Sequence, residues 1–312
     1  MVQRPMARKS VLIVSNTNDL HALAVRRELA ARGFPVHLLA CDRLRDHLLT
    51  SGFGSEPFLE TEGGRVETAG VSTVWWRRPS LDQRLPEGAL DEDQVHFVNA
   101  NCKATLRSFL RGSFTGTWVS SPEATDRAAD KLHQLNVARR LGLRVPDTLL
   151  SNDPASVRAF HRRHGGRVII KAALNSSRVF LATRPADLDR ISDAQIRAVP
   201  SLYQEFIPGT AHLRVNCFGT DIHAALIETD ALDWRPDINV PISAHRIDAA
   251  LQKQLIALLE ALDLRTGVMD LKISDRGETV WFEVNPQGQF LFLEPLTGQN
   301  LLAAFTEFLL RA

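Results

Sequence analysis

The sequence predicts a mixed α/β fold with α+β parts: an α/β opening, a small central unit and a final antiparallel sheet. Three observations predict it. Residues 11–40 alternate an apolar strand run, an amphipathic helical pattern and a second strand run, which is typical of parallel strands joined by a helix. Residues 121–200 mix capped helices with short strands. Residues 202–286 hold strand-like runs separated by short turns, which indicates antiparallel pairing.

The first part, residues 1–120, opens as strand, helix and strand; Asn18 or Asp19 can cap the helix, which stops at Gly33. Apolar strand runs flank this helix at 11–15 and 36–40. Shorter strand-like pieces, divided by Gly and Pro, follow at 56–60, 65–70 and 72–76. A long helical pattern and the last strand of this part are expected at 91–111 and 118–121.

The central part, residues 121–200, starts where the hydroxyl of Ser121 can cap a helix and Pro122 takes the first helical position. We expect this helix to continue to Leu141 and to stop at Gly142. A strand, a capped helix and a buried strand follow at 144–150, 151–160 and 167–173. A polar turn and a short strand complete this part at 174–178 and 179–183.

The last part, residues 201–312, contains most of the expected strands. Three antiparallel strands are expected at 202–207, 212–219 and 221–229. A loop rich in Asp, Pro and Asn and an amphipathic helix follow at 230–245 and 248–262. A turn at 275–277 joins two further strands at 267–274 and 279–286, and the final helix covers roughly 297–311. This order predicts a sheet with helices beside it.

The composition excludes several classes of protein. Hydrophobic residues make up 44% and charged residues 23% of the 312 positions, which is ordinary for a globular protein. The net charge of +1 gives no global field for nucleic acid or an anionic membrane, so an anionic ligand needs a local cluster of cations. The apolar run near the start is too short for a signal peptide or a membrane span. Three scattered cysteines fit reduced thiols, and we expect a cytoplasmic protein.

Two expected neighbouring strands carry a cluster of oxygen ligands. Glu283 and Asn285 are two residues apart in one strand and therefore point to one face. A hairpin partner brings Asp270 beside them. Two carboxylates and an amide suit Mg²⁺ that bridges nucleotide phosphates. The alternative is an outward-facing polar strip on a half-buried sheet. Trp281 and Phe282 argue against it, because they put large apolar groups on both faces.

Two lysines extend this cluster toward a phosphate site. Lys131 lies in the helix that starts at Ser121, and Lys171 follows the apolar run at 168–170. A cation that ends a buried strand can point at phosphates beyond the strand's carboxyl end. The polar turn at 174–178 offers further hydrogen-bond donors, although it has no glycine. An ordinary solvated side chain is the alternative for each lysine taken alone, and more so for Lys131 than for Lys171.

The succession of these motifs over about 120–300 resembles the ATP-grasp superfamily. It comprises a lysine on a helix, a strand ending in lysine, a Tyr-Gln-Glu-Phe-Ile-Pro-Gly segment, an arginine-bearing strand, Asp-Leu-Lys and Glu-Val-Asn-Pro. The resemblance implies that both lysines contact the phosphates of ATP and that Mg²⁺ is held by Asp270, Glu283 and Asn285. It also implies a linker beside the adenine, formed by Gln204, Glu205, Phe206 and Ile207. His212 stands where related ligases often carry an acid near the ribose; it can serve a ribose hydroxyl or lie on the surface.

A finer resemblance is to the graspetide synthetases, relatives of the microviridin macrocyclases. It rests on Asp233-Trp234-Arg235, on the segment 283–290 and on Trp75-Trp76-Arg77-Arg78-Pro79. It implies a pre-ATP-grasp domain over 1–120, a central lid subdomain over 121–200 and a C-terminal ATP-grasp subdomain over 201–312. The implied substrate is a precursor peptide with a leader and an acidic core, and dimers are implied as well. A loop salt bridge for Asp233 and Arg235, and an edge strand for 75–78, remain alternatives.

The implied reaction activates an Asp or Glu side chain as an acyl phosphate and closes an ester or amide with a Ser or Thr hydroxyl or a Lys amine. Arg214 and Arg235 are expected to stabilise negative charge, and Asp233 to orient the nucleophile or take its proton. A closing lid is expected at 150–200. The edge of the strand pair 212–229 and the loop 230–245 are candidate surfaces for the peptide.

Two other readings stay open. A related ligase could join free amino acids or add glutamate to a protein terminus. From a different class, the chain could be a nucleotide- or peptide-binding module without catalysis. A Rossmann dehydrogenase is disfavoured, because the first strand is followed by Ser-Asn-Thr-Asn-Asp and not by a Gly-x-Gly-x-x-Gly motif.

Overall fold

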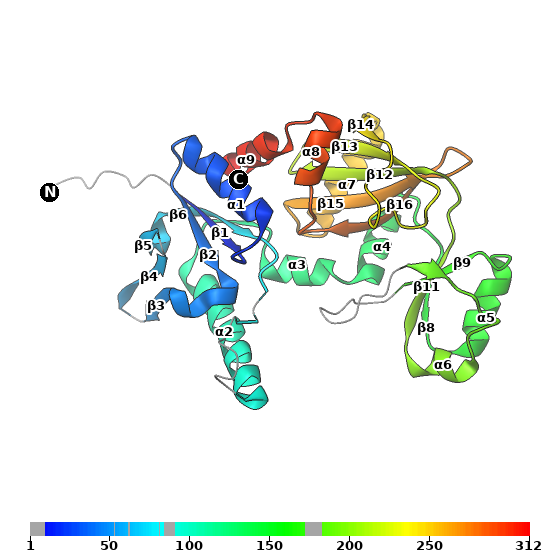
Figure 1. Cartoon of the computed structure of the whole chain (residues 1–312), viewed down its shortest axis with the longest axis horizontal. Coiled ribbons are helices and arrows are strands. Elements are labelled where there is room, and N and C mark those ends of the chain that lie inside the picture. The colour runs from blue at the N-terminus through cyan, green and yellow to red at the C-terminus, as the bar shows by residue number, and fades with distance from the viewer. Residues whose placement is uncertain (1–9, 53, 62, 81, 84–90, 172–182) are drawn as a thin grey trace.

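The computed structural model describes the chain except for residues 1–9, 53, 62, 81, 84–90 and 172–182. Its described residues form four sheets with helices around them, as Figure 1 shows. A parallel sheet lies near the N-terminus, a small antiparallel sheet lies at the opposite end, and a five-stranded antiparallel sheet lies between and above them. The predicted mixed α/β class is confirmed. The expected turn at 174–178 and most of the expected strand at 179–183 lie outside the described residues.

The N-terminal sheet is parallel, with strand order β2-β1-β6-β7. Its strands are β2 (Val36–Ala40), β1 (Ser10–Ser15), β6 (Val71–Trp76) and β7 (Thr117–Val119). Helix α1 (Leu20–Ala31) begins where the side chain of Asp19 accepts hydrogen bonds from the backbone N–H groups of His21 and Ala22. Because β6 lies between β1 and β7, the edge-strand alternative for 75–78 is wrong.

A second, three-stranded sheet and a long helix complete the first part. The sheet joins β3 (Leu48–Gly52), β4 (Ser55–Thr61) and β5 (Gly64–Glu67), and the helix is α2 (Glu92–Ser113). Short 3-10 turns precede and follow this sheet at Cys41–Asp46 and Thr68–Gly70. The strand β3 was not expected from the sequence, because Leu48–Gly52 is largely exposed and carries only a weak apolar pattern.

The helix expected from 121 to 141 is two helices, so that prediction is wrong in detail. They are α3 (Pro122–Ala128) and α4 (Lys131–Arg140). The side chain of Asp130 accepts a hydrogen bond from the backbone N–H of His133 and caps the second helix. This break makes Lys131 the first residue of α4, at the end that faces the large sheet.

The small sheet has the strand order β10-β9-β11-β8. It contains β8 (Thr148–Ser151), β9 (Val168–Lys171), β10 (Arg184–Pro185) and β11 (Ser201–Glu205). Helices α5 (Pro154–Arg163) and α6 (Asp193–Ala198) accompany it. The strand expected at 202–207 therefore pairs with β8 and β9 in this sheet and not with β12.

The large sheet is antiparallel, with strand order β14-β13-β12-β15-β16. Its strands are β12 (Ala211–Phe218), β13 (Asp221–Glu228), β14 (Ile242–His245), β15 (Thr266–Ile273) and β16 (Thr279–Asn285). The expected loop 230–245 thus ends in a strand. Because β14 pairs with β13 and β15 pairs with β12, neither strand of 212–229 has a free edge. That part of the expected peptide surface is wrong.

Helices cover one face of the large sheet and join it to the N-terminal part. Helix α7 (Ala249–Ala261) packs with α3 and α4 on the face that buries Leu213, Met269 and Trp281. After a 3-10 turn (Leu291–Leu293) and α8 (Glu294–Thr297), helix α9 (Leu301–Arg311) packs against α1 (Figure 1). The division of the chain at 120 and 200 stays a prediction. Among the described residues, no helix is long and apolar enough to cross a membrane.

Candidate functional site

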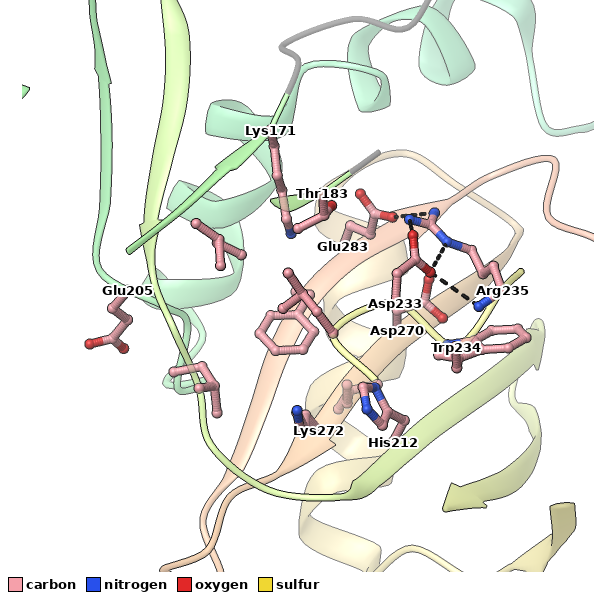
Figure 2. A pocket seen from close by; sticks show the side chains of 15 residues that line it. Lys171, Thr183, Glu205, His212, Asp233, Trp234, Arg235, Asp270, Lys272 and Glu283 are labelled. Carbon is pink, nitrogen blue, oxygen red and sulfur yellow. Dashed lines mark hydrogen bonds and ion pairs between the residues drawn. The ribbon is translucent and has the colours of Figure 1, made fainter. Parts of the chain in front are cut away.

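A pocket lies between the small sheet and the face of the large sheet opposite to α7, and Figure 2 shows its side chains. The small sheet and the linker contribute Ile169, Lys171, Thr183, Glu205 and Ile207. The large sheet contributes His212, Asp270, Lys272, Phe282 and Glu283. The segment between β13 and β14 contributes Leu232, Asp233, Trp234 and Arg235. The pocket, which we call the central pocket, therefore gathers predicted residues from three distant stretches of the chain.

Strand alternation and one bulge orient the acids. Asp270 on β15 pairs with Glu283 on β16, and the register shifts immediately afterwards, so that Leu271 pairs with Trp281. Phe282 is the extra residue of this bulge. A bulge breaks the alternation of side chains, and here both Phe282 and Glu283 line the pocket while Trp281 lies in the core. The predicted hairpin is confirmed, and Trp281 and Phe282 occupy different faces as expected.

Glu283 lies at the centre of a ring of cations. Its carboxylate is 3.8 Å from the guanidinium of Arg235 and 4.0 Å from the ammonium of Lys131. Burial raises the pKa of Glu283, yet the surrounding cations, with Lys171 the largest contributor, hold it below its usual range. Burial also lowers the pKa of Lys171, and Glu283 offsets part of that effect. Lys171, Lys131 and Arg235 thus gather around one carboxylate, and this local cluster of cations suits an anionic ligand.

Asn285 and Lys131 line a second hollow that shares Glu283 with the central pocket. Asn285 pairs opposite Val268, and its side-chain oxygen accepts a hydrogen bond from the backbone N–H of Gln287 at 3.0 Å. Buried Gln134 holds this corner, because its amide group donates to and accepts from the backbone of Val284 at 2.9 Å each. Helix α4, and with it Lys131, is thereby fixed beside β16.

The oxygen groups fit a magnesium ion bound together with a nucleotide. Mg²⁺ in such sites uses one or two carboxylates and completes its shell with phosphates and water. Asp270 and Glu283 are adjacent carboxylates, and the amide of Asn285 follows on the same strand. No group of three His, Cys, Asp or Glu side chains that could hold a metal is found in the described part of the chain.

Asp233 and Arg235 form the loop salt bridge that the sequence left as an alternative. The Arg235 guanidinium donates to both carboxylate oxygens of Asp233, at 2.7 Å each (Figure 2). Burial raises the pKa of Asp233, and hydrogen bonds from Arg235 outweigh it and keep the pKa low. The pair nevertheless lines the pocket, with Arg235 directed at Glu283. Asp233 and Arg235 therefore form a salt bridge and also belong to the candidate site.

Arg214 is buried beneath the pocket. Its guanidinium donates to both oxygens of Asp270 at 2.8 and 3.0 Å and to the backbone carbonyl of Gln289 at 3.1 Å. It also lies 5.5 Å from the ring centroid of Trp234. Arg214 is 7% exposed, so it orients Asp270 in this structure and has little surface left for a ligand.

The segment from Gln204 to Ile207 crosses from the small sheet to the large one. Gln204 is buried and donates to the hydroxyl of Thr148 at 3.0 Å, and Ile207 borders the pocket. Figure 2 shows the carboxylate of Glu205 pointing away from the other labelled side chains, and this carboxylate forms an ion pair with Arg144. The backbone N–H of Phe206 donates to the carbonyl of Arg167 at 3.0 Å. The segment thus presents mainly backbone and apolar groups to the pocket.

His212 is buried at the pocket wall, so the surface alternative for this residue is wrong. Burial, together with the neighbouring Lys272, lowers the pKa of His212 to about 4. Its ring nitrogen Nε2 has no hydrogen-bond partner among the described residues. A neutral imidazole with a spare nitrogen can donate to or accept from a ligand hydroxyl.

Sequence reasoning missed three residues that shape the site. Lys272 lines the pocket two residues after Asp270, and strand alternation could have indicated it. Gln134 gave only a weak signal, as a polar residue at a buried helical position. Arg77 stood out only as part of the Trp75–Pro79 motif, and its role could not be predicted, because its guanidinium donates to the carbonyls of the distant segment 287–288.

Comparisons with known proteins give the fold a family context. No family model matches the chain. The crystal structure of the macrocyclase MdnC bound with the precursor peptide MdnA, from Microcystis aeruginosa, is 26% identical and covers 97% of this chain and 100% of that one, with a TM-score of 0.88. A RiPP-associated ATP-grasp ligase from Chryseobacterium gregarium, in complex with ADP and a leader and core peptide, is 22% identical over 97% of each chain, with a TM-score of 0.86.

Among curated proteins, a probable alpha-L-glutamate ligase from Trichodesmium erythraeum is 26% identical over 217 residues, which are 66% of this chain and 71% of the relative. The structural and sequence similarities agree on one type of enzyme. They confirm the predicted ATP-grasp fold and the predicted ligase class.

Proposed function

We propose that this ATP-grasp ligase activates Asp or Glu side chains of a ribosomal precursor peptide and joins them to hydroxyls or amines of the same peptide, forming macrocyclic esters or amides. The observation that carries the proposal is the central pocket, where Asp270 and Glu283 are adjacent within a ring of Lys and Arg side chains. Full-length likeness to MdnC and to the Chryseobacterium ligase supports a peptide as the substrate, since both were solved with precursor peptides.

ATP would lie across the central pocket. The backbone of the linker at Ile207 and the imidazole of His212 would border the nucleoside, while Lys171 and Lys131 would hold the phosphates. Mg²⁺, held by the oxygens of Asp270, Glu283 and Asn285, would neutralise phosphate charge during transfer. The Arg214–Asp270 ion pair fixes the orientation of one of these carboxylates.

The reaction then has two steps. A carboxylate oxygen of the peptide attacks the γ-phosphorus of ATP, the bond between that phosphorus and the β,γ-bridging oxygen breaks, and ADP leaves. A hydroxyl or amine attacks the acyl carbon, phosphate leaves, and the proton of the nucleophile passes to the departing phosphate. The peptide loses one water, about 18 Da, for each ring.

Arg235 is the side chain best situated to stabilise the oxyanion of the second step, because it borders the pocket beside Glu283. Asp233 has both oxygens engaged by Arg235 and a lowered pKa, which makes it a poor proton acceptor. We therefore assign Asp233 the role of orienting Arg235. The small sheet between residues 148 and 205 is the proposed lid, which would exclude water from the acyl phosphate.

The leader of the precursor needs a docking surface outside the reaction pocket. Because both strands of 212–229 are internal, the free edge on this side of the large sheet belongs to β14. We propose β14 and the preceding part of the loop 230–241 as the surface that an extended peptide can join. The cytoplasm as the location and a homodimer as the assembled state remain predictions.

A second candidate is favoured by the curated relatives. The similarity of this chain to probable alpha-L-glutamate ligases supports a ligase that adds glutamate or another free amino acid to an acceptor. The pocket chemistry is the same for both activities, since each requires an acyl phosphate. The substrate decides between them.

Mass spectrometry of candidate substrates tests the proposal. The chain would be incubated with ATP, Mg²⁺ and a short acidic peptide, rich in Thr, Ser or Lys, that is encoded beside it. Loss of about 18 Da per ring is expected, with slower reaction when the leader is removed and partial recovery when the leader is added in trans. Mass gains from free glutamate, without dehydration of the peptide, would replace the cyclase by the amino-acid ligase.

A further inference from the structure

A second groove lies at the carboxyl ends of strands β1 and β6, on the N-terminal side of the central pocket. We call it the Arg78 groove; its lining includes Asn16, Asp19, Arg78, Ser80, Gln287 and Phe292, and the carboxylate of Asp19 is already paired with Arg77 at 3.1 Å. In open parallel sheets, ligands commonly bind beyond the carboxyl ends of the strands. None of the residues predicted to bind ATP or metal lines this groove, so it is distinct from the nucleotide site.

The rim of the groove is a turn that is held by side-chain hydrogen bonds and that exposes the guanidinium of Arg78. The side-chain amide of Asn16 donates to the carbonyl of Arg78 at 3.0 Å, and its oxygen accepts from the backbone N–H of Ser80 at 2.8 Å. Arg78 adopts a φ of 43°, a conformation that L-residues rarely take. Its side chain is exposed, and no acidic residue of the described chain forms an ion pair with it.

The opposite wall is the segment that follows β16, and side chains of the N-terminal part hold it through hydrogen bonds. Arg77 donates to the carbonyls of Gln287 and Gly288, the latter at 2.9 Å. His21 accepts from the backbone N–H groups of Phe290 and Leu291 at 2.9 and 3.1 Å. A preorganised wall lowers the cost of binding a flexible peptide.

The groove continues toward the reaction pocket through aromatic side chains. The rings of Phe292, which lines the groove, and Trp234, which lines the central pocket, are stacked with centroids 6.0 Å apart. Arg235 follows Trp234 and lies 3.8 Å from Glu283. A peptide in the groove would therefore run past Phe292 and bring one of its side chains to the phosphate end of the central pocket.

We infer that the Arg78 groove binds the acidic core segment of the peptide substrate and that the Arg78 guanidinium pairs with a carboxylate next to the one being activated. An exposed, unpaired cation beside a polar and partly apolar groove is complementary to a segment in which Asp or Glu alternates with Ser or Thr. The inference rests on the proposed function, because it assigns the substrate of the same reaction to a place on the protein.

The test uses two synthetic peptides that differ only in charge: a labelled peptide with three Glu residues among Thr residues, and its twin with Gln at those positions. Binding would be followed by fluorescence anisotropy at low ionic strength. The parent chain should prefer the Glu peptide, and Arg78→Gln should weaken binding of that peptide by about threefold, the scale of an exposed ion pair. Arg78→Lys should retain most of the preference.

The control is Arg276→Gln, which removes the same charge from the exposed turn between β15 and β16. Affinity for ADP should be equal in all variants, because Arg78 lies outside the nucleotide pocket. Equal loss in the Arg276 and Arg78 variants, or no loss in either, would overturn the inference. Since binding is measured without turnover, an absence of dehydration in the parent would refute the proposed function alone.

Discussion

Asp270 and Glu283 face each other across the β15–β16 ladder, one pair before the bulge that turns Phe282 and Glu283 toward the same pocket. Each carboxylate has its own cations: Arg214 for Asp270, and Lys131 and Arg235 for Glu283. Two neighbouring carboxylates repel each other unless cations neutralise them. Their cations and their shared orientation make this pair the centre of the candidate site.

Glu283→Gln should lower ATP-dependent turnover by about a hundredfold or more, because it removes an anionic ligand and leaves the surrounding cations without their partner. The rate of ADP formation in the presence of peptide measures it. Glu278→Gln, which changes an exposed acid of the same hairpin, should have no effect. Turnover of the Glu283 variant within a few-fold of the parent would refute the metal assignment.

Lys171→Ala should weaken ATP binding by roughly 1.5–3 kcal/mol, the scale of a hydrogen bond to a charged group. Lys171 ends β9 at the pocket wall, with its ammonium 5.3 Å from the ring centroid of Phe282. Isothermal calorimetry measures the change. Lys253→Ala, on the exposed face of α7, serves as the matched control. Equal affinities of the Lys171 variant and the parent would contradict its role at the phosphates.

Acid should destabilise the protein through His21. Burial and the neighbouring Arg77 lower the pKa of His21 to about 4, so the unfolded state binds more protons between about pH 6.5 and 4. The contribution of the neutral His21 to the free energy of unfolding is therefore fully present above about pH 6.5, and it is lost as the pH decreases through this window. The loss from this group is about 2 kcal/mol at pH 5.

His21→Gln tests this dependence, because a glutamine oxygen can accept hydrogen bonds at the same place but does not titrate. Urea unfolding at pH 7 and pH 5 should show a smaller difference for this variant than for the parent. His133→Gln, on the exposed side of α4, should keep the dependence of the parent. A His21 variant as acid-sensitive as the parent would show that other groups cause the loss.

Gln134→Ala should destabilise the fold by about 1–3 kcal/mol, the cost of leaving buried polar groups without partners. The variant removes both hydrogen bonds to the backbone of Val284 and frees α4 from β16. Denaturant unfolding measures the effect, and Asn136→Ala on the exposed side of the same helix is the control. Because Lys131 begins α4, affinity for ATP should fall as well. Unchanged affinity would show that the hydrogen bonds of Gln134 do not position Lys131 for ATP.

Local sequence determined the elements and several of their ends. The expected hairpin placed Asp270 beside Glu283, and a capping residue expected at 18 or 19 marked the start of α1, which Asp19 caps. Strand and helix signals of this kind depend on residues a few positions apart, so they can be predicted from the sequence. The resemblance to the ATP-grasp superfamily also comes from the sequence, through the order of the lysine, Glu-Phe-Ile, Asp-Leu-Lys and Glu-Val-Asn motifs.

Only the tertiary structure decided which sheet each strand joins and where the helices break. The strand β11 pairs with β8 and β9, although β12 is its neighbour in sequence. Pairing between distant strands depends on the whole set of packing partners and not on local pattern. The same holds for the bulge at Phe282, since the extra residue is defined only by the partner strand.

One physical reason explains why some features followed from the sequence and others only from the tertiary structure. What the sequence by itself determined was the type of residue available for chemistry: two acids, an amide, two lysines and the Asp233–Arg235 pair. What tertiary structure decided was the state of each group. Burial made His212 neutral, Arg214 became the partner of Asp270, and Arg77 came to hold a loop 210 residues away in sequence. Electrostatic environment is a property of three-dimensional neighbours, and those neighbours come from segments that share no local signal.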